Sequence, residues 1–224
     1  MLNFRDLGGY PNHKGSIIRS GLIFRGGCPT LSGSDAPTLD QHRIQTLIDL
    51  RTPIEQQYFN PRSVYPQIEW LSLPLVSDFT QEFSYTHTLT TQDALANLKH
   101  LFERVIQLQA SPVMVHCTMG KDRTGVVMIL LMSCLGCSQA DTLKEFLKTN
   151  DHIQDLADYL DTQMPSDLKK LLIRKKPRLV YAEDLDRLCQ PAGGFEGVPQ
   201  YLIQRGVLTP KTLSQLQKLL LAPA

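Results

Sequence analysis

The chain has little of what marks nucleic-acid-binding, membrane-spanning or metal-binding proteins. Its 23 Lys and Arg residues balance 22 Asp and Glu residues, so no overall field would attract nucleic acid. The longest apolar stretch, residues 126–137, is interrupted by Ser133 and Gly136 and is too short to span a bilayer. No group of His and acidic residues has the spacing of metal ligands, so we expect neither a metal nor another cofactor.

The five cysteines are an odd number and form no regular disulfide framework. Cys134 and Cys137 have the C-x-x-C spacing of a redox pair, but they lie inside an apolar, helix-like run. We expect these two residues to be small buried hydrophobic side chains. The first six residues lack the charged-then-apolar pattern of a secretory signal.

The order of the predicted elements favours an α/β fold in one domain, residues 1–224, with a mainly parallel central sheet flanked by helices. Residues 1–20 look loop-like. Strands are predicted at 22–25, 46–50, 68–73 and 113–116, and helices at 38–44, from Thr52-Pro53 onward, and at 91–109. Later helices are predicted at 124–135, 138–148, 153–160, 167–174, 182–188, 199–205 and 210–221. Residues 76–89 lack clean periodicity, so we expect a mobile flap there.

The most informative segment is the polar loop that follows the predicted strand at 113–116. Cys117 and Arg123 bracket five residues, and this spacing closes a loop whose backbone N–H groups point inward. Such a ring of amides at the start of a helix is a cradle for a tetrahedral dianion. Arg123 adds a planar fork of donors to the same anion. We expect the amides of residues 118–123 and Arg123 to bind a phosphate, that is Thr118, Met119, Gly120, Lys121, Asp122 and Arg123.

Cys117 lies at the bottom of this cradle, where the same positive field favours the thiolate over the thiol. A thiolate against a bound phosphate is a nucleophile. The loop therefore predicts phosphomonoester hydrolysis through a cysteinyl-phosphate intermediate.

Here the chain resembles the bacterial and fungal branch of the cysteine-based protein tyrosine phosphatases, which acts on both phosphotyrosine and phosphoinositides. The loop from His116 to Gly125 is similar to the signature of that branch. Further segments that resemble it are Asn3 to Tyr10, Leu22 to Gly26, Leu47 to Thr52 with Glu55, Tyr201-Leu202 and Gly206 to Leu208. Two positions depart from the pattern: Gly26 stands where the branch has Ser, and Met119 replaces an alanine, which would alter the rim of the pocket.

Two residues that flank the loop have supporting roles in our interpretation. His116 would orient the loop through hydrogen bonds of a partly buried ring. Thr124, one residue past Arg123, would donate a hydrogen bond to the sulfur of Cys117 when it leaves. Alternatively, Thr124 is simply the residue at which the helix starts. Lys121 would add positive potential for substrates with several phosphates.

Three carboxylates are candidates for the general acid that protonates the leaving oxygen. Asp122, inside the loop, comes first because the resemblance favours it, although it could instead be an ion-pair partner of Arg123. Asp78, in the predicted flap, is the second candidate. Asp49, in the segment that resembles the Asp-Leu-Arg motif, is the third.

The remaining charged residues are expected to be structural. Arg51 and Glu55 would pair one helical turn apart. Arg5 and Asp6 would fasten the N-terminal arm, with support of the phosphate loop as a weaker alternative. Residues 169–178 hold six cationic residues in ten. This run is a solvated helix face or, alternatively, a peripheral contact with anionic lipid.

The sequence therefore predicts a cysteine-dependent phosphatase of phosphoproteins, most of all at phosphotyrosine and with phosphoserine or phosphothreonine as further targets. Two alternatives stay open, a phosphoinositide phosphatase and a phospho-binding pseudophosphatase, although the latter would normally have lost Cys117 or Arg123. Because a thiolate needs reducing surroundings, the cytoplasm is the expected location. A secreted effector that is exported without a signal is the other possibility.

Overall fold

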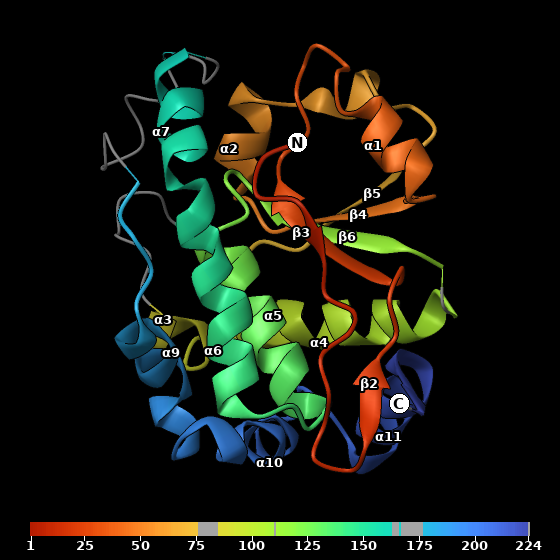
Figure 1. Ribbon diagram of the computed structural model, residues 1–224, viewed down its shortest axis with the longest axis vertical. Helices are drawn as coiled ribbons and strands as arrows, with labels where there is room; N and C mark the ends of the chain where they lie inside the picture. Colours follow the sequence, from red (N-terminus) through yellow and green to blue (C-terminus); the bar gives the residue numbers. More distant parts are fainter. Residues whose placement is uncertain (76–84, 110, 163–165, 167–176, 224) are drawn as a thin grey trace.

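The computed structural model describes residues 1–75, 85–109, 111–162, 166 and 177–223. Its main sheet has the strand order β1-β3-β6-β4-β5. The strands are β1 (Arg5–Asp6), β3 (Ile23–Gly27), β6 (Val113–Cys117), β4 (Thr46–Asp49) and β5 (Glu69–Ser72). The last four are parallel, and β1 is antiparallel to β3. The predicted mainly parallel sheet is confirmed, with the strand of Cys117 at its centre (Figure 1).

The helices are α1 (Ala36–Gln41), α2 (Pro53–Tyr58), α3 (Tyr85–Thr88), α4 (Gln92–Gln107), α5 (Asp122–Cys134), α6 (Gln139–Leu147), α7 (Ile153–Thr162), α9 (Ala182–Cys189), α10 (Val198–Gln204) and α11 (Pro210–Leu220). Short 3₁₀ turns occur at Pro61–Ser63, Lys148–His152, Gln190–Ala192 and Phe195–Gly197. Among the helices of the described residues, none is long and apolar enough to cross a membrane.

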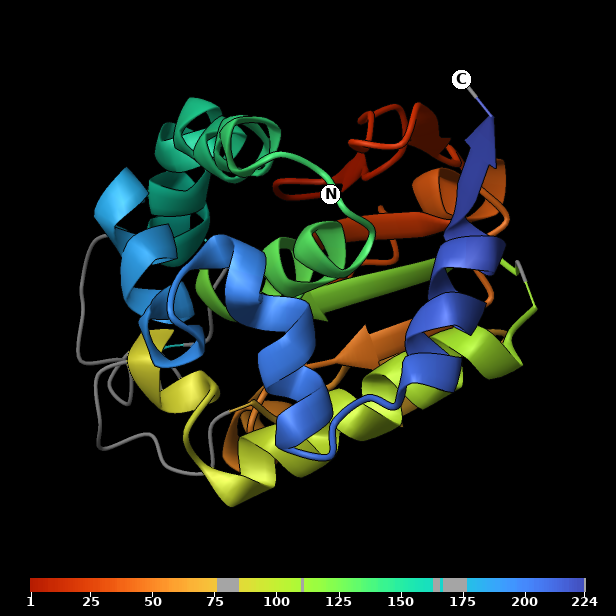
Figure 2. The same ribbon diagram turned by 90° about the horizontal axis from the view of Figure 1, so that it is seen from below.

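The two faces of the sheet pack against different helices, because side chains alternate along a strand. Val113 and Val115 of β6 belong to the large core that includes α4, α5, α10 and α11. Met114, between them, faces the smaller cluster that contains Leu39 of α1. Figure 1 shows α1 on one side of the sheet and α4 and α5 on the other, and Figure 2 shows α10 and α11 packed against these two helices. The apolar surface of α5 is buried almost all round, as expected for a central helix.

Both chain ends contribute strands where the sequence predicted none. Residues 1–20 are not all loop, because they contain β1 and β2 (Ser16–Ile18). The last helix ends at Leu220, and Leu221–Pro223 forms β7, which pairs antiparallel with β2. The pairing joins residues about 200 positions apart, such as Ile17 and Ala222, so no local sequence pattern predicts it.

The predicted flap at 76–89 is only partly described. Residues 76–84 lie outside the described residues, and the remainder forms helix α3. The predicted helix at 167–174 and all the lysines of the basic run also lie outside them, whereas Arg178 is described.

Candidate active site

The candidate site lies at the carboxyl end of β6, where open parallel sheets hold their ligands. Cys117 is the last residue of β6, and its Cα pairs with that of Gly27 in β3. On the other side of β6, His116 pairs with Asp49 at the end of β4. Four residues connect the strand to α5, which begins at Asp122. The strand, loop and helix predicted from the sequence are therefore present, with the helix starting two residues earlier than expected.

Gly120 lets this loop approach the neighbouring strand. Its φ of +66° is in the left-handed region, and a Cβ there would lie 2.3 to 2.6 Å from backbone atoms of Gly26 and Gly27. No other residue fits both the conformation and the space. At Gly26 a Cβ would lie 2.6 Å from Cε of Met114, the end of a flexible side chain, so Met114 would have to move.

The carbonyl of Gly120 is held by two side chains that the sequence analysis did not single out. Arg25 Nη2 donates to it at 2.6 Å, and Asn3 Nδ2 donates at 2.8 Å. Glu145 of α6 holds Arg25 through Nη1 at 2.9 Å and Arg5 through Nε at 2.7 Å. The local sequence signal that could have pointed to Arg25 is its charge, which is unusual inside the apolar run of β3.

Arg5 also donates to Asn3, and Asp6 accepts from the amides of Gly8 and Gly21, so both residues fasten the N-terminal arm as expected. Arg5 is linked to the loop only indirectly, through Asn3 and Glu145.

The backbone amides of the loop have no protein acceptor. Within the described part of the chain, no backbone or side-chain oxygen receives a hydrogen bond from the N–H groups of residues 118–123. Buried or half-buried amides normally find a partner. Six consecutive unpaired donors beside Cys117 therefore match the expected anion cradle.

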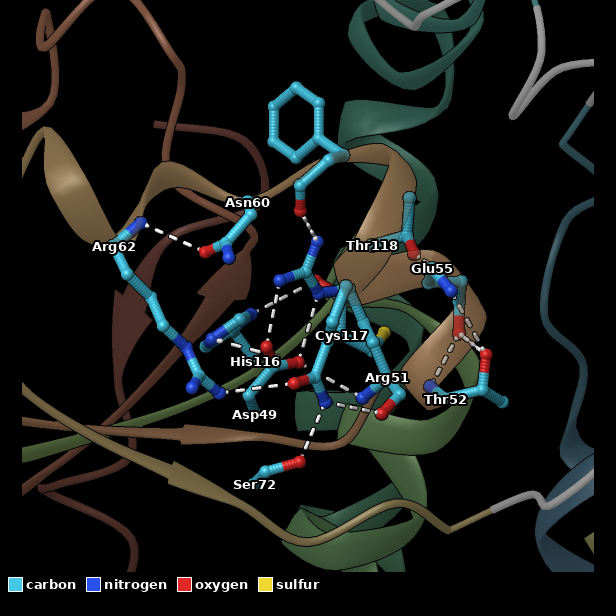
Figure 3. A network of polar contacts seen from close by, with 12 residues as sticks. Asp49, Arg51, Thr52, Glu55, Asn60, Arg62, Ser72, His116, Cys117 and Thr118 are labelled. Carbon is cyan, nitrogen blue, oxygen red and sulfur yellow. Dashed lines mark hydrogen bonds and ion pairs between the residues drawn. The ribbon is translucent and has the colours of Figure 1, made fainter.

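Arg123 is held in place by Glu55 of α2. Its Nη2 donates to Glu55 Oε1 at 2.7 Å, and its Nη1 forms a second short bond to Oε2. Thr118 Oγ1 also donates to Glu55 Oε1, at 2.5 Å. Burial opposes the ionisation of Glu55, but the charge of Arg123 and these hydrogen bonds keep the pKa of Glu55 below its usual value. The same carboxylate closes the capping box of α2 with Thr52, and Figure 3 shows it between Thr52 and Thr118.

The predicted pair of Arg51 with Glu55 is wrong. Helix α2 begins at Pro53, so Arg51 precedes it and is not on a helical face with Glu55. Arg51 instead binds Asp49 with two bonds, Nε to Oδ1 at 2.9 Å and Nη2 to Oδ2 at 2.7 Å. Its Nη1 donates to the carbonyl of Phe59 at 2.7 Å. Asp49 and Arg51 thus form a buried pair beside Cys117 (Figure 3).

His116 is fully buried next to this pair. Its Nδ1 lies 3.3 Å from the carbonyl oxygen of Cys117, and its Nε2 lies 3.9 Å from Asp49 Oδ1. Burial lowers the pKa of His116 to about 4, although Asp49 acts in the opposite direction. The ring is therefore neutral near pH 7, and its contact with the Cys117 carbonyl is the feature that would orient the loop.

Among the described residues, Asp122 has two hydrogen-bond partners, and neither is Arg123. Lys121 Nζ and the hydroxyl of Tyr85 each lie 2.6 Å from Asp122 Oδ1. Burial opposes the charge of Asp122, but Lys121 and Tyr85 hold the pKa of its carboxyl below the usual value. Lys121 is buried rather than solvated. Its ammonium is thus already paired with the neighbouring carboxylate.

Three further expectations can be compared with the geometry. The hydroxyl of Thr124 is buried and has no hydrogen-bond partner among the described residues, and the bond expected when the Cys117 sulfur leaves stays a prediction. Met119 is half-buried and packs on an apolar cluster made by Cys28, Phe59, Tyr159 and Leu160 with Leu2. Asp78 lies outside the described residues.

Cys134 and Cys137 are buried, as expected, and so are Cys28 and Cys189. Cys134, Cys137 and Cys189 are buried thiols, and burial raises the pKa of each to about 12. Burial likewise raises the pKa of Cys28. Among the described residues, no group of three His, Cys, Asp or Glu side chains could hold a metal ion.

Comparison with known proteins gives matches to one family. A model of the tyrosine phosphatase family matches residues 1–222. A Cupriavidus necator protein named as a tyrosine-protein phosphatase is 28% identical over 169 residues, which are 66% of this chain and 60% of that protein. The triple specificity protein phosphatase PtpB of Mycobacterium tuberculosis is 38% identical over 55 residues, 24% of this chain and 20% of PtpB. The chain thus spans less than two thirds of the length of either relative.

Solved structures are similar at lower identity. PTPMT1 in complex with PI(5)P has a TM-score of 0.47 and 14% identity, over 83% of this chain and 93% of that one. TpbA of P. aeruginosa has a TM-score of 0.42 and 15% identity, over 71% of this chain and 91% of that one.

Proposed function

We propose that this chain, which belongs to the tyrosine phosphatase family, is a phosphatase that uses Cys117 as its nucleophile. The observation that carries the proposal is the loop itself. Six amides without an acceptor among the described residues, together with the Arg123 guanidinium, belong to the loop that directly follows Cys117 at the end of the central strand. Donors of this number and charge suit a phosphate dianion.

In the first step the Cys117 thiolate attacks phosphorus. A P–S bond forms while the bond from phosphorus to the leaving oxygen breaks. The amides of residues 118–123 and Arg123 would bind the three equatorial oxygens, whose charge and geometry change most toward the transition state. Of the five N–H groups of Arg123, two donate to Glu55 and one donates to the Thr118 hydroxyl at 3.4 Å, so two remain for the phosphate.

The leaving oxygen needs a proton, and Asp122 is the best-placed donor among the described residues. Both oxygens of Asp49 are bound by Arg51 in a buried pair, so Asp49 is better suited to support than to proton transfer. Asp122 belongs to the loop, and its side chain is 26% exposed. The charge of a bound phosphate dianion would raise the pKa of this carboxyl from its low value in the free chain. Water then attacks phosphorus in the cysteinyl-phosphate, the Asp122 carboxylate takes its proton, and the P–S bond breaks to release phosphate and restore the Cys117 thiolate.

Phosphotyrosine in proteins is the substrate we favour, with phosphoserine and phosphothreonine next. The similarity to PtpB, a protein named for triple specificity, supports a range wider than one phosphoamino acid. Phosphoinositides are the second candidate, because Lys121 puts an ammonium in the phosphate loop. A pseudophosphatase is disfavoured because Cys117 and Arg123 are both present and positioned. A thiolate nucleophile would also need the reducing conditions of the cytoplasm.

The test compares 4-nitrophenyl phosphate, a phosphotyrosine peptide and phosphatidylinositol phosphate vesicles side by side. Cys117→Ser should abolish turnover of all three and still bind the phosphopeptide, because the amides and Arg123 remain. Cys189→Ser, at a buried cysteine of α9 outside the site, is the matched control and should keep activity. Appreciable turnover by Cys117→Ser would remove the covalent mechanism.

A further inference from the structure

Tyr85 lies outside the phosphate loop and forms a hydrogen bond with Asp122. It opens α3, immediately after residues 76–84, and it is buried. Its hydroxyl donates to Asp122 Oδ1 at 2.6 Å, across 37 positions of sequence. Nothing in the local pattern of residues 76–89 points to this contact.

The hydrogen bonds to Asp122 are one-sided. Oδ1 accepts from both Tyr85 and Lys121, whereas Oδ2 accepts none from the described residues. The carboxylate is therefore held through Oδ1, and Oδ2 is left available for proton transfer. A proton that Asp122 transfers would be carried by Oδ2, because Oδ1 already receives two donors.

The ring of Tyr85 is itself fixed. Phe146 of α6 packs on it edge to face, with ring centroids 6.2 Å apart. The Arg178 guanidinium lies 6.0 Å from the ring centroid, and Asp184 of α9 holds that guanidinium with bonds of 2.8 and 2.9 Å. Helices α3 and α9 pack side by side. The hydroxyl of Tyr85 therefore has little freedom to leave Asp122.

The charges around this contact are consistent with a donor role. Burial and the Asp122 carboxylate raise the pKa of Tyr85, so its O–H stays protonated. The groups that face Asp122 are Lys121 on the loop, Tyr85 on α3 and Arg178 before α9. Asp184 interacts with Tyr85 and Arg178.

We propose that Tyr85 is a positioning residue for proton transfer, which holds Asp122 so that Oδ2 faces the leaving oxygen. This inference rests on the proposed function, with Asp122 as the acid. As the P–S bond forms and the bond to the leaving oxygen breaks, the proton on Oδ2 passes to that oxygen. The carboxylate left behind is stabilised by the hydrogen bonds from Tyr85 and Lys121. In the second step it takes a proton from the water that attacks phosphorus, and the P–S bond breaks to restore the thiolate.

The test is Tyr85→Phe, assayed on an alkyl phosphate and on 4-nitrophenyl phosphate, whose leaving group needs no proton. Loss of a hydrogen bond to a charged group corresponds to about tenfold in rate. We expect kcat/KM to fall about tenfold for the alkyl phosphate and to change little for 4-nitrophenyl phosphate. Because the lost bond favoured the charged carboxylate, the pKa of Asp122 should rise. The basic limb of the alkyl phosphate profile should then move to higher pH by about one unit.

Tyr201→Phe is the matched control, since the Tyr201 hydroxyl donates to the Leu89 carbonyl at 2.8 Å, outside the site. It should leave the ratio of the two substrates and the pH profile unchanged. If Tyr85→Phe does not fold, replacement of Tyr85 by 3-fluorotyrosine keeps the ring packing and strengthens the donor. The basic limb should then move to lower pH.

The two proposals fail in different ways. No turnover of 4-nitrophenyl phosphate by the parent chain, or full turnover by Cys117→Ser, would overturn the proposed function. If the parent chain is active and Cys117→Ser is not, the proposed function holds and the inference about Tyr85 is tested separately. An unchanged substrate ratio and pH limb in Tyr85→Phe, or an unmoved limb with 3-fluorotyrosine, would then overturn it.

Discussion

Glu55→Gln is expected to lower the stability of the fold, because it removes the carboxylate that holds Arg123. The two oxygens of Glu55 accept hydrogen bonds from Arg123, from the Thr118 hydroxyl, and from the amide and hydroxyl of Thr52. Glutamine has the same shape but one acceptor oxygen, and its NH₂ group would face one of these donors. Arg123 would remain charged and largely buried without a counter-charge.

The expected loss follows from the burial of this pair. Removing one partner of a buried ion pair costs about 3–5 kcal/mol. For a protein of this size, each kcal/mol lowers Tm by about 2–4 °C, so Tm should fall by about 6–20 °C. Thermal unfolding followed by circular dichroism measures the change. Inorganic phosphate should raise Tm more in the variant than in the parent, because the dianion supplies the missing counter-charge.

Glu69→Gln is the matched control for this prediction. Glu69 pairs with Arg104 at 2.5 Å, but its side chain is 51% exposed. An exposed pair is worth about 0–1 kcal/mol, so Tm should fall by no more than about 4 °C. Equal falls in Tm for the two variants would refute the reasoning that Glu55 stabilises the fold as the buried counter-charge of Arg123. Equal stabilisation of the parent and of Glu55→Gln by phosphate would refute it too.

The effect of Glu55→Gln should also depend on pH. The pKa of Glu55 is lower in the folded chain than the unfolded value of about 4.3. The carboxylate therefore stabilises the fold fully above that unfolded value, and the stabilisation is lost as pH falls through the folded pKa. The gap in Tm between parent and variant should be constant near neutral pH and narrow only in acid.

Three other predictions test the remaining roles. Arg123→Lys should lower kcat/KM on 4-nitrophenyl phosphate by about 10²–10³, because lysine has no fork to bind Glu55 and phosphate together; a loss under tenfold would contradict this. Asp122→Asn should slow alkyl phosphates by about 10²–10⁴, spare 4-nitrophenyl phosphate and flatten the basic limb of the pH profile. If Asp78→Asn shows this selectivity instead, the acid is Asp78. Neutralising the four lysines of the basic run (Lys169, Lys170, Lys175 and Lys176) should reduce turnover of phosphoinositide in anionic vesicles, mostly at low salt. Equal losses on a phosphotyrosine peptide would mean that these lysines merely support the fold.

The parts of the fold and site that could be predicted are those determined by residues close together in the sequence. The apolar runs gave the parallel strands β3, β4, β5 and β6 to within two residues at each end. The spacing of Cys117 and Arg123 placed the loop between strand and helix. Both are short-range features, in which the residues that define the structure are neighbours in sequence.

What could not be predicted depends on contacts between distant segments. Glu55 was assigned the wrong arginine because sequence distance favoured Arg51, whereas folding brings it to Arg123, 68 residues away. The contacts of Arg25 with Gly120 and of Tyr85 with Asp122 join residues 95 and 37 positions apart. β2 and β7 are too short to show a strand pattern, and they pair with each other across about 200 positions of sequence.

The tight packing of Gly120 against β3 has a consequence for how this family should vary. A side chain at position 26 would meet the end of Met114, and one at position 120 would meet the backbone of Gly26. Positions 26 and 114 are therefore expected to change together among relatives, with a shorter residue at 114 wherever a serine occupies 26. Position 120 has no such compensation, since its neighbours are main-chain atoms. A library that randomises 26 and 114 jointly should yield folded variants that neither single library contains. A separate library that randomises position 120 should return only glycine among its folded members.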